Sequence, residues 1–221
     1  MYSIQASPAS LTKYGEEICG DDLRLEWVPG GLVAVLADGM GNGIRANILA
    51  TLTSRIIAGM LAKGEPLEDA VGIVVDTLPA SPDRGEAYCT FAAVWLGEEG
   101  EGRLALFDSP PAILLRRGRL LEIPLEAHAI AGRRILRGGF QMRPGDLFTL
   151  FSDGAVHAGL SSALPWGWGW QGVADYLRSA YRPGLDAPAA TKLLSAACES
   201  LYGGRPGDDV SLLNLSLARR T

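Results

Sequence analysis

Histidine and cysteine are scarce in this sequence. The chain of 221 residues has two histidines, His128 and His157, which argues against a transition-metal site built from several imidazoles. Its three cysteines are odd in number and widely spaced, with no CxxC pair. This pattern predicts reduced, structural thiols in a cytoplasmic protein rather than a disulfide framework.

Long apolar runs and excess basic charge are also lacking. No window has 18 consecutive apolar residues, so we expect no membrane span, and the N-terminal segment lacks the pattern of a signal peptide. The net charge is −5, and a nucleic-acid surface would need a basic patch to displace phosphate counterions. We therefore expect neither a membrane nor a nucleic acid as a partner.

The apolar pattern predicts a single α+β domain over residues 1–221, with mostly antiparallel strands and helices inserted in pairs. The apolar or alternating runs predict strands at 23–28, 32–37, 88–96, 103–108, 112–116, 120–123, 135–142, 147–152 and 209–217. Helices are predicted at 44–61, 67–78, 171–180 and 187–201. In the first helix, apolar residues recur every four positions and form one face, at Ile48, Leu52, Ile56 and Met60.

Three aspartates stand where apolar strands end or begin: Asp38 after LVAVLA, Asp153 after LFTLFS, and Asp208 just before VSLLNL. Such strands can bring three carboxylates to one edge of a sheet. Converging carboxylates repel each other unless a cation lies between them, and Mg²⁺ and Mn²⁺ prefer oxygen ligands. The simplest functional interpretation is a metal site built from strand ends.

Each of these motifs also has a purely structural interpretation. Asp-Gly is a common turn dipeptide, although Asp38 and Asp153 follow fully apolar strands. Asp208-Asp209 could be a solvated turn. The glycine-rich bend at 39–43 could cradle phosphate at a helix N-terminus or could simply connect a strand to a helix, and it lacks the Walker lysine.

Three further features leave alternatives open. The acidic stretch around Gly20 is either a solvated face or a second layer of carboxylates. His157 follows Asp153 by four residues and is interpreted as a neighbour of the site rather than as a ligand. The tryptophans of WGWGW, at 166–170, suggest packing under a loop more than a binding surface.

Taken together and in order, several segments resemble the metal-dependent serine/threonine protein phosphatases of type 2C, and most closely the bacterial branch typified by stage II sporulation protein E. The matching segments are GEEICGDD (15–22), ADGMGNGIRA (37–46), EAYCTFAAVWL (86–96), SPPAILLRRG (109–118), FSDG (151–154) and GDDVSLL (207–213). The combination spans almost the whole chain and is far more specific than any of its parts.

The resemblance implies a four-layer α-β-β-α sandwich and a role for each site residue. Asp38 would bridge two Mn²⁺ or Mg²⁺ ions, with a third ion left open, and Gly39 would supply a backbone carbonyl to one of them. Asp153 and Asp208 would bind the other ion. Asp21 would hold metal-bound water, and the role of Asp209 is left open, because many relatives have Asn there. A hydroxide that bridges the ions would then hydrolyse phosphoserine or phosphothreonine.

Two departures from the wider family stand out. Met40 occupies a position where many eukaryotic relatives have a histidine, and no phosphate-gripping arginine is evident near 13–19. We therefore expect modest intrinsic activity. In the bacterial branch the helix pair that follows the glycine-rich bend acts as a regulatory switch, which corresponds here to 44–61 and 67–78 and suggests a homodimer through these helices.

By analogy, the substrate would be a phosphorylated anti-sigma-factor antagonist or stressosome component, in a stress-response or sporulation pathway. Two other functions are weighed against this one. A catalytically weak or inactive phosphatase-like binding module would have no reason to keep the full set of repelling carboxylates. A nucleotide-binding protein that used the glycine-rich bend would lack the lysine that such loops use.

Overall fold

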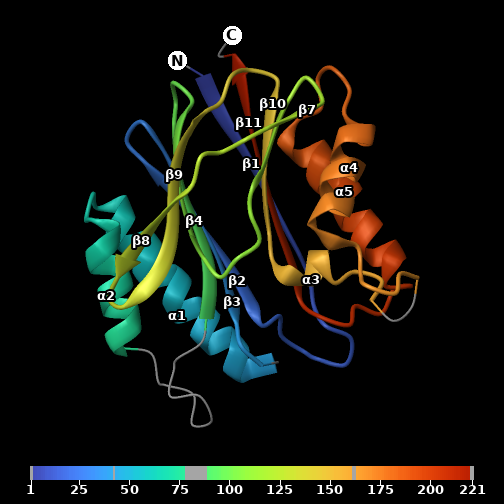
Figure 1. The fold of residues 1–221 in the computed structure, drawn as a ribbon, viewed down its shortest axis with the longest axis horizontal. Coiled ribbons are helices and arrows are strands. Elements are labelled where there is room, and N and C mark those ends of the chain that lie inside the picture. The colour runs from blue at the N-terminus through green and yellow to red at the C-terminus, as the bar shows by residue number, and fades with distance from the viewer. Residues whose placement is uncertain (1, 42, 78–88, 161–162, 220–221) are drawn as a thin grey trace.

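The computed structural model describes residues 2–41, 43–77, 89–160 and 163–219. Within these ranges, two antiparallel sheets stack face to face (Figure 1). The first sheet has the order β1 (Tyr2–Leu11), β11 (Val210–Arg219), β10 (Asp146–Phe151), β6 (Ile113–Arg116) and β7 (Arg119–Leu121). The second has the order β2 (Asp21–Val28), β3 (Gly31–Gly39), β4 (Cys89–Gly97), β5 (Glu101–Phe107), β9 (Arg133–Gln141) and β8 (Glu126–Ile130).

Helices cover the outer face of each sheet, which makes four layers. The helices are α1 (Gly43–Ala62), α2 (Leu67–Thr77), α3 (Asp153–Val156), α4 (Gly169–Ala180) and α5 (Ala187–Leu201). Figure 1 shows α1 and α2 beside the second sheet and α4 and α5 beside the first. This arrangement confirms the predicted α+β sandwich with two antiparallel sheets and flanking helix pairs.

Strand β3 explains why the core has separate layers. Leu32, Leu36 and the other even-numbered apolar residues of β3 join the cluster between the two sheets. Val33 and Val35 join the cluster beneath α1 and α2. Because successive side chains of a strand point to opposite faces, a strand buried on both faces must be apolar throughout, as the LVAVLA run predicts.

Helix α1 packs through small side chains rather than through the predicted apolar face. Its buried residues are Gly43, Ala46, Ala50, Thr53, Ser54, Ile57 and Ala58. Ile48 and Leu52 are 51% and 42% exposed, whereas Ile56 and Met60 are partly buried. In the first part of the helix the buried side chains are all small, because the backbone lies close to β3 there, and Ile57 is the large buried side chain farther along. A Cβ on Gly39 would lie 2.1 Å from the carbonyl oxygen of Ala46.

By length and composition, α1 is the one helix in the described ranges that meets the criterion for a membrane span, and 33% of its apolar window is buried. Core helices meet the same criterion, so this is weak evidence for a span.

Two strands are additional to those predicted from the sequence. Strand β1 is an edge strand that pairs with β11 and contains Pro8, and strand β8 is mostly exposed at the opposite edge of the other sheet. Neither has the continuous apolar pattern that marks a buried strand. Three predicted positions lie outside the described residues. They are Leu78, the last residue of the predicted helix 67–78, Tyr88, the first residue of the predicted strand 88–96, and residue 42 of the glycine-rich bend.

Candidate metal centre

Asp21 and Asp38 lie opposite each other at one end of the β2–β3 pair. Strand β2 begins at Asp21, β3 ends at Asp38-Gly39, and the antiparallel register pairs the two aspartates. Directly opposed residues of two antiparallel strands have Cβ atoms about 4.5–5.5 Å apart on the same face of the sheet. Asp38 shares that face with Leu36, so both carboxylates point toward the other sheet.

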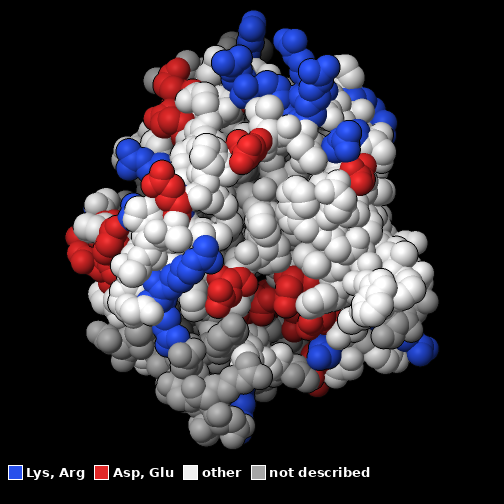
Figure 2. Space-filling view, viewed as in Figure 1, with Lys and Arg blue, Asp and Glu red and all other residues white. Residues whose placement is uncertain are grey.

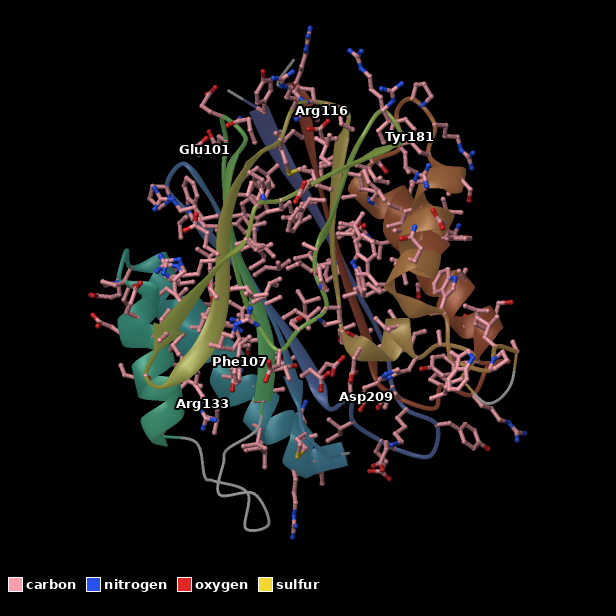
Figure 3. The ribbon with its side chains drawn as sticks, viewed as in Figure 1. Glu101, Phe107, Arg116, Arg133, Tyr181 and Asp209 are labelled. Atoms are coloured by element: carbon pink, nitrogen blue, oxygen red, sulfur yellow. The ribbon has the colours of Figure 1, made fainter. Side chains whose placement is uncertain are left out.

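The other two predicted carboxylates come from the first sheet. Asp153 begins α3 directly after β10, and Asp208 lies just before β11, the strand paired with β10. Polar side-chain atoms of Asp153, Asp208 and His157 lie within 4.8 Å of one another. Figure 2 shows acidic side chains gathered in a hollow at the lower centre of the molecule, and in Figure 3 Asp209 marks the same end of the sandwich. The structure thus brings all four predicted carboxylates to one place.

Burial and mutual repulsion raise the pKa values of these carboxyl groups. Desolvation, followed by the charges of Asp21 and Asp153, raises the pKa of Asp38 to about 9. Desolvation likewise raises the pKa of Asp21 to about 7, with a further contribution from the charges of Asp209 and Asp153. Desolvation and the charge of Asp153 also raise the pKa of Asp208. Carboxylates this crowded require a compensating cation to remain ionised together.

The atoms available at the site suit a hard divalent cation. Oδ2 of Asp21 is buried and has no hydrogen-bond partner among the described residues. A buried carboxylate oxygen without a partner is costly, unless an ion or a water molecule bound to one satisfies it. The converging ligands are carboxylate oxygens, which Mg²⁺ and Mn²⁺ prefer. The predicted residues therefore fit the ions that the sequence implies.

Glycine at 39 and 154 is required by close backbone packing. A Cβ on Gly154 would lie 2.0 Å from the carbonyl oxygen of Asp209. A Cβ on Gly39 would lie similarly close, 2.1 Å, to the carbonyl oxygen of Ala46 on α1. Both glycines directly follow a site aspartate, so the two contacts fix the backbone beside Asp38 and Asp153. The role of the Gly39 carbonyl as a ligand stays a prediction.

Asp209 has a different task from Asp208. Its side chain is buried and accepts a hydrogen bond of 2.9 Å from the backbone N–H of Lys13. A Cβ on Gly20 would lie 2.8 Å from Oδ2 of Asp209. Asp209 therefore holds the segment between β1 and β2 against the start of β11, and this segment carries the chain to Asp21.

The acidic stretch at 16–22 divides into separate roles. Only Asp21 joins the cluster, while Asp22 accepts a hydrogen bond from the hydroxyl of Ser54 on α1. Neither a wholly solvated face nor a second layer of carboxylates describes this stretch. The side chains of Asp21 and Asp22 point to opposite faces of β2 because they are consecutive in a strand.

His157 lies beside the acidic cluster, and its ring groups with Asp153 and Asp208 as a candidate metal ligand, so its interpretation as a neighbour stays a prediction. Its Nδ1 atom lies 3.9 Å from Oδ2 of Asp153, and both side chains are about half exposed.

The tryptophan-rich segment packs as predicted at two of its three positions. Trp168 contacts Tyr176 edge to face, and the Nε1–H of Trp170 donates to the carbonyl of Pro111, while Trp166 is 89% exposed.

Three residues near the site were missed by the sequence analysis. Ser152 and Ser211 are buried, and their hydroxyl groups favour the charged form of Asp21, which opposes the rise in its pKa. The charge of Lys13 lowers the pKa of Asp208, against the larger effect of burial. Ser152 directly precedes Asp153, a position that could have signalled a supporting role. For Lys13 the sequence offers no signal, since a loop brings it to the site.

The family model described as Stage II sporulation protein E (SpoIIE) matches residues 29–218 of the chain. The chain belongs to this family. A search of curated proteins found no match. The family match covers β3 and the segments that carry Asp38, Asp153 and Asp208, and it leaves Asp21 outside its limits.

Solved structures with the same fold include bacterial phosphatase domains of the PP2C type. The PP2C domain of SpoIIE from Bacillus subtilis, with a fragment of its regulatory domain, matches with a TM-score of 0.79 at 18% identity over 100% of this chain and 64% of that one. The RsbU and RsbW domains of a Mycobacterium tuberculosis protein match with a TM-score of 0.75 at 20% identity, over 99% of this chain and 61% of that one.

A third match is the SiaA PP2C domain of Pseudomonas aeruginosa, with a TM-score of 0.74 at 19% identity over 95% of this chain and 85% of that one. At such identities these matches establish the fold of this SpoIIE family member. The chain spans less than two thirds of the first two structures, 64% and 61% of their lengths.

Proposed function

We propose that this chain is a Mn²⁺- or Mg²⁺-dependent phosphatase that removes phosphate from phosphoserine or phosphothreonine on a regulatory protein. The observation that carries this proposal is the convergence of four carboxylates from two different sheets, one of them with an unpartnered buried oxygen. Membership of the SpoIIE family and the PP2C fold of the structural matches support the same activity.

Each residue has a proposed task. Asp38 and the carbonyl of Gly39 would hold one of two cations, with Asp38 shared between them, and Asp153 and Asp208 would complete the second. Such cations, when bound, supply a water of lowered pKa and offset the charge of the phosphoryl oxygens. Asp21 would orient water through its unpartnered Oδ2 atom.

The chain itself offers little help to the leaving group. Met40, which follows the Asp38-Gly39 pair, is 40% exposed and has no proton to donate. Lys13 is the described cation whose charge reaches Asp208, so it is the best candidate to attract substrate phosphate to the site. We expect modest turnover of small aryl phosphates and faster turnover of a protein substrate that orders the site.

The substrate and the assembly are proposed by analogy. One structural match carries RsbU and RsbW domains and another is described as part of the bacterial stressosome, which supports a phosphorylated signalling protein as substrate in a cytoplasmic pathway. We also propose a homodimer through α1 and α2. The outer face of α1 supports it, because Ile44, Ile48 and Leu52 are exposed at successive turns of the helix.

The test is hydrolysis of p-nitrophenyl phosphate by protein stripped of metal and then supplied with Mn²⁺ or Mg²⁺. We expect turnover only with added cation, and a loss of at least about 100-fold in Asp38→Asn, because one removed charge disrupts both ions. Robust turnover after complete metal removal would overturn the proposal. Calorimetric titration separates the binding-module alternative, which predicts no uptake of Mn²⁺ at millimolar concentration.

A further inference from the structure

A second hollow lies on the outer face of the sheet that contains β3, away from the acidic cluster. It encloses about 810 Å³ between the α1–α2 turn and strands β4, β5, β8 and β9. Small-molecule sites in proteins enclose roughly 300–1,000 Å³, and they combine apolar walls with a few polar groups. The family match and the proposed phosphatase function assign no role to this hollow.

Small side chains form the floor of the hollow. The strand register aligns Trp95, Arg103 and Gly139 in one row across β4, β5 and β9. The adjacent row on the same face is Ala93, Ala105 and Arg137. Ala93, Ala105 and Gly139 thus lie together, with larger side chains around them, which leaves the space above them open.

The helices end where this space begins. Helix α1 ends at Ala62 and α2 begins at Leu67, so the turn between them roofs the hollow instead of filling it. Leu61 and Leu67 line this roof and also pack against the cluster beneath the helices. The hollow therefore adjoins the apolar layer, and no side chain of the described residues fills it.

Most charges around the hollow have partners. Arg137 forms an ion pair with Glu68 at the start of α2. His128 lies 4.0 Å from Glu126, whose side chain is 86% exposed and extends into solvent. Glu65 is exposed on the rim.

Among the cations that line the hollow, Arg103 differs from Arg137. Its guanidinium lies over the ring of Trp95, 5.6 Å from the centroid, and it forms no ion pair with any residue in the described ranges. Stacking on an aromatic face orders a guanidinium and leaves its N–H groups free to donate. The hollow thus combines an apolar floor with one ordered cation on its wall.

We propose that this hollow binds a small ligand with a flat apolar body and one anionic group, with the body over Ala93, Ala105 and Gly139 and the anion on Arg103. A carboxylate, sulfonate or phosphate would satisfy the guanidinium equally well. The proposal is independent of the phosphatase activity, because none of these residues belongs to the acidic cluster.

The test uses anilinonaphthalene sulfonate, an apolar aromatic anion whose fluorescence rises in apolar sites, titrated into the wild-type protein and two variants. Gly139→Leu fills the hollow: a Cβ there meets only the carbonyl oxygen of Gly102, at 3.7 Å. We expect it to weaken binding by about tenfold or more, since the ring is excluded. Arg103→Gln should weaken binding by about fivefold, since a charge-assisted hydrogen bond is lost.

Two controls make the outcome decisive. Ile48→Ser removes an exposed apolar side chain on α1 and should leave the affinity unchanged. If this variant loses binding while both hollow variants keep it, the dye binds α1 and the proposal is overturned. Stronger binding of an aromatic amidinium than of the sulfonate would overturn the assignment of an anion. Thermal unfolding checks the fold of Gly139→Leu, and if that variant is unfolded, Arg103→Gln decides.

Discussion

Asp21 and Asp38 are directly opposed across β2 and β3, and burial raises the pKa of both above that of an ordinary aspartate. In most sheets such a pair would carry opposite charges or none, because like charges directly opposite each other destabilise the ladder. Here the pair is placed at the mouth of the sandwich, where Asp153 and Asp208 add further negative charge. The metal-free fold is therefore expected to be destabilised by its own site.

The first prediction concerns pH. Asp38 keeps its proton in the folded state up to about pH 9, whereas the unfolded chain releases it near 3.8. Between these values the folded state binds more protons, so the free energy of unfolding falls as pH rises. The melting temperature of the metal-free protein, followed by circular dichroism in EDTA, should decrease across this window. Asp38→Asn should flatten the decrease, and a melting temperature that rises with pH would contradict the argument.

The second prediction separates two glycines. Gly39→Ala should destabilise the protein by about 2–3 kcal/mol, because the new Cβ would lie 2.1 Å from the carbonyl oxygen of Ala46 and force α1 away. Gly139→Ala is the matched control: its Cβ meets only an ordinary contact of 3.7 Å. Urea denaturation should place the control within about 1 kcal/mol of wild type. Equal effects would mean that the close approach of α1 is not rigid.

The third prediction concerns Lys13, whose charge acts on Asp208. Lys13→Met should tighten Mn²⁺ binding and raise the KM for a phosphorylated substrate, each by about two- to fivefold, because the lost charge repels cations and attracts phosphate. Calorimetry and steady-state kinetics measure the two effects. Lys63→Met is the control. Lys63 follows the C-terminal end of α1, whereas the N-terminal end of that helix lies beside the site, so this substitution should change neither constant. Movement of both constants in the same direction would exclude this electrostatic role.

The fourth prediction concerns an ion pair far from the site, in which the carboxylate is buried and the guanidinium is partly exposed. The side chain of Asp146 is 2% exposed, and it accepts hydrogen bonds from Nε and Nη2 of Arg116 and from the backbone N–H of Arg143. Asp146→Ala should cost about 2 kcal/mol in urea denaturation, because the hydrogen bonds to the buried carboxylate are lost and the backbone N–H of Arg143 is left without its acceptor. The surface pair Arg178–Asp175 is the comparison, and Asp175→Ala should cost much less than Asp146→Ala, because water screens an exposed pair. Similar costs for the two pairs would show that burial does not matter at Asp146.

The sequence was sufficient for the buried strands and the positions of the site aspartates. A strand buried on both faces leaves a continuous apolar run, and such runs lead to Asp38 and Asp153. Edge strand β1 was missed because one face is solvated and Pro8 interrupts its pattern. Asp21 came from family resemblance alone, since its pairing with Asp38 is a matter of strand register.

The packing face of α1 could not be predicted for a different reason. Hydrophobicity alone predicts that the large residues Ile48 and Leu52 are buried, but both are exposed. The distance between the helix backbone and the sheet decides which side chains fit between them. The helix lies too close to Gly39 for large side chains, so alanines face β3. A sequence pattern records how apolar a residue is, and it does not record how near the next element passes.

The position of β11 in the first sheet has a consequence for the order of assembly. This strand lies between β1, near the start of the chain, and β10, and it follows Asp208. During synthesis β1 stays unpaired until its partner β11 has emerged from the ribosome. The four carboxylates therefore meet only after nearly every other element has been made, so the acidic cluster is incomplete in a nascent chain.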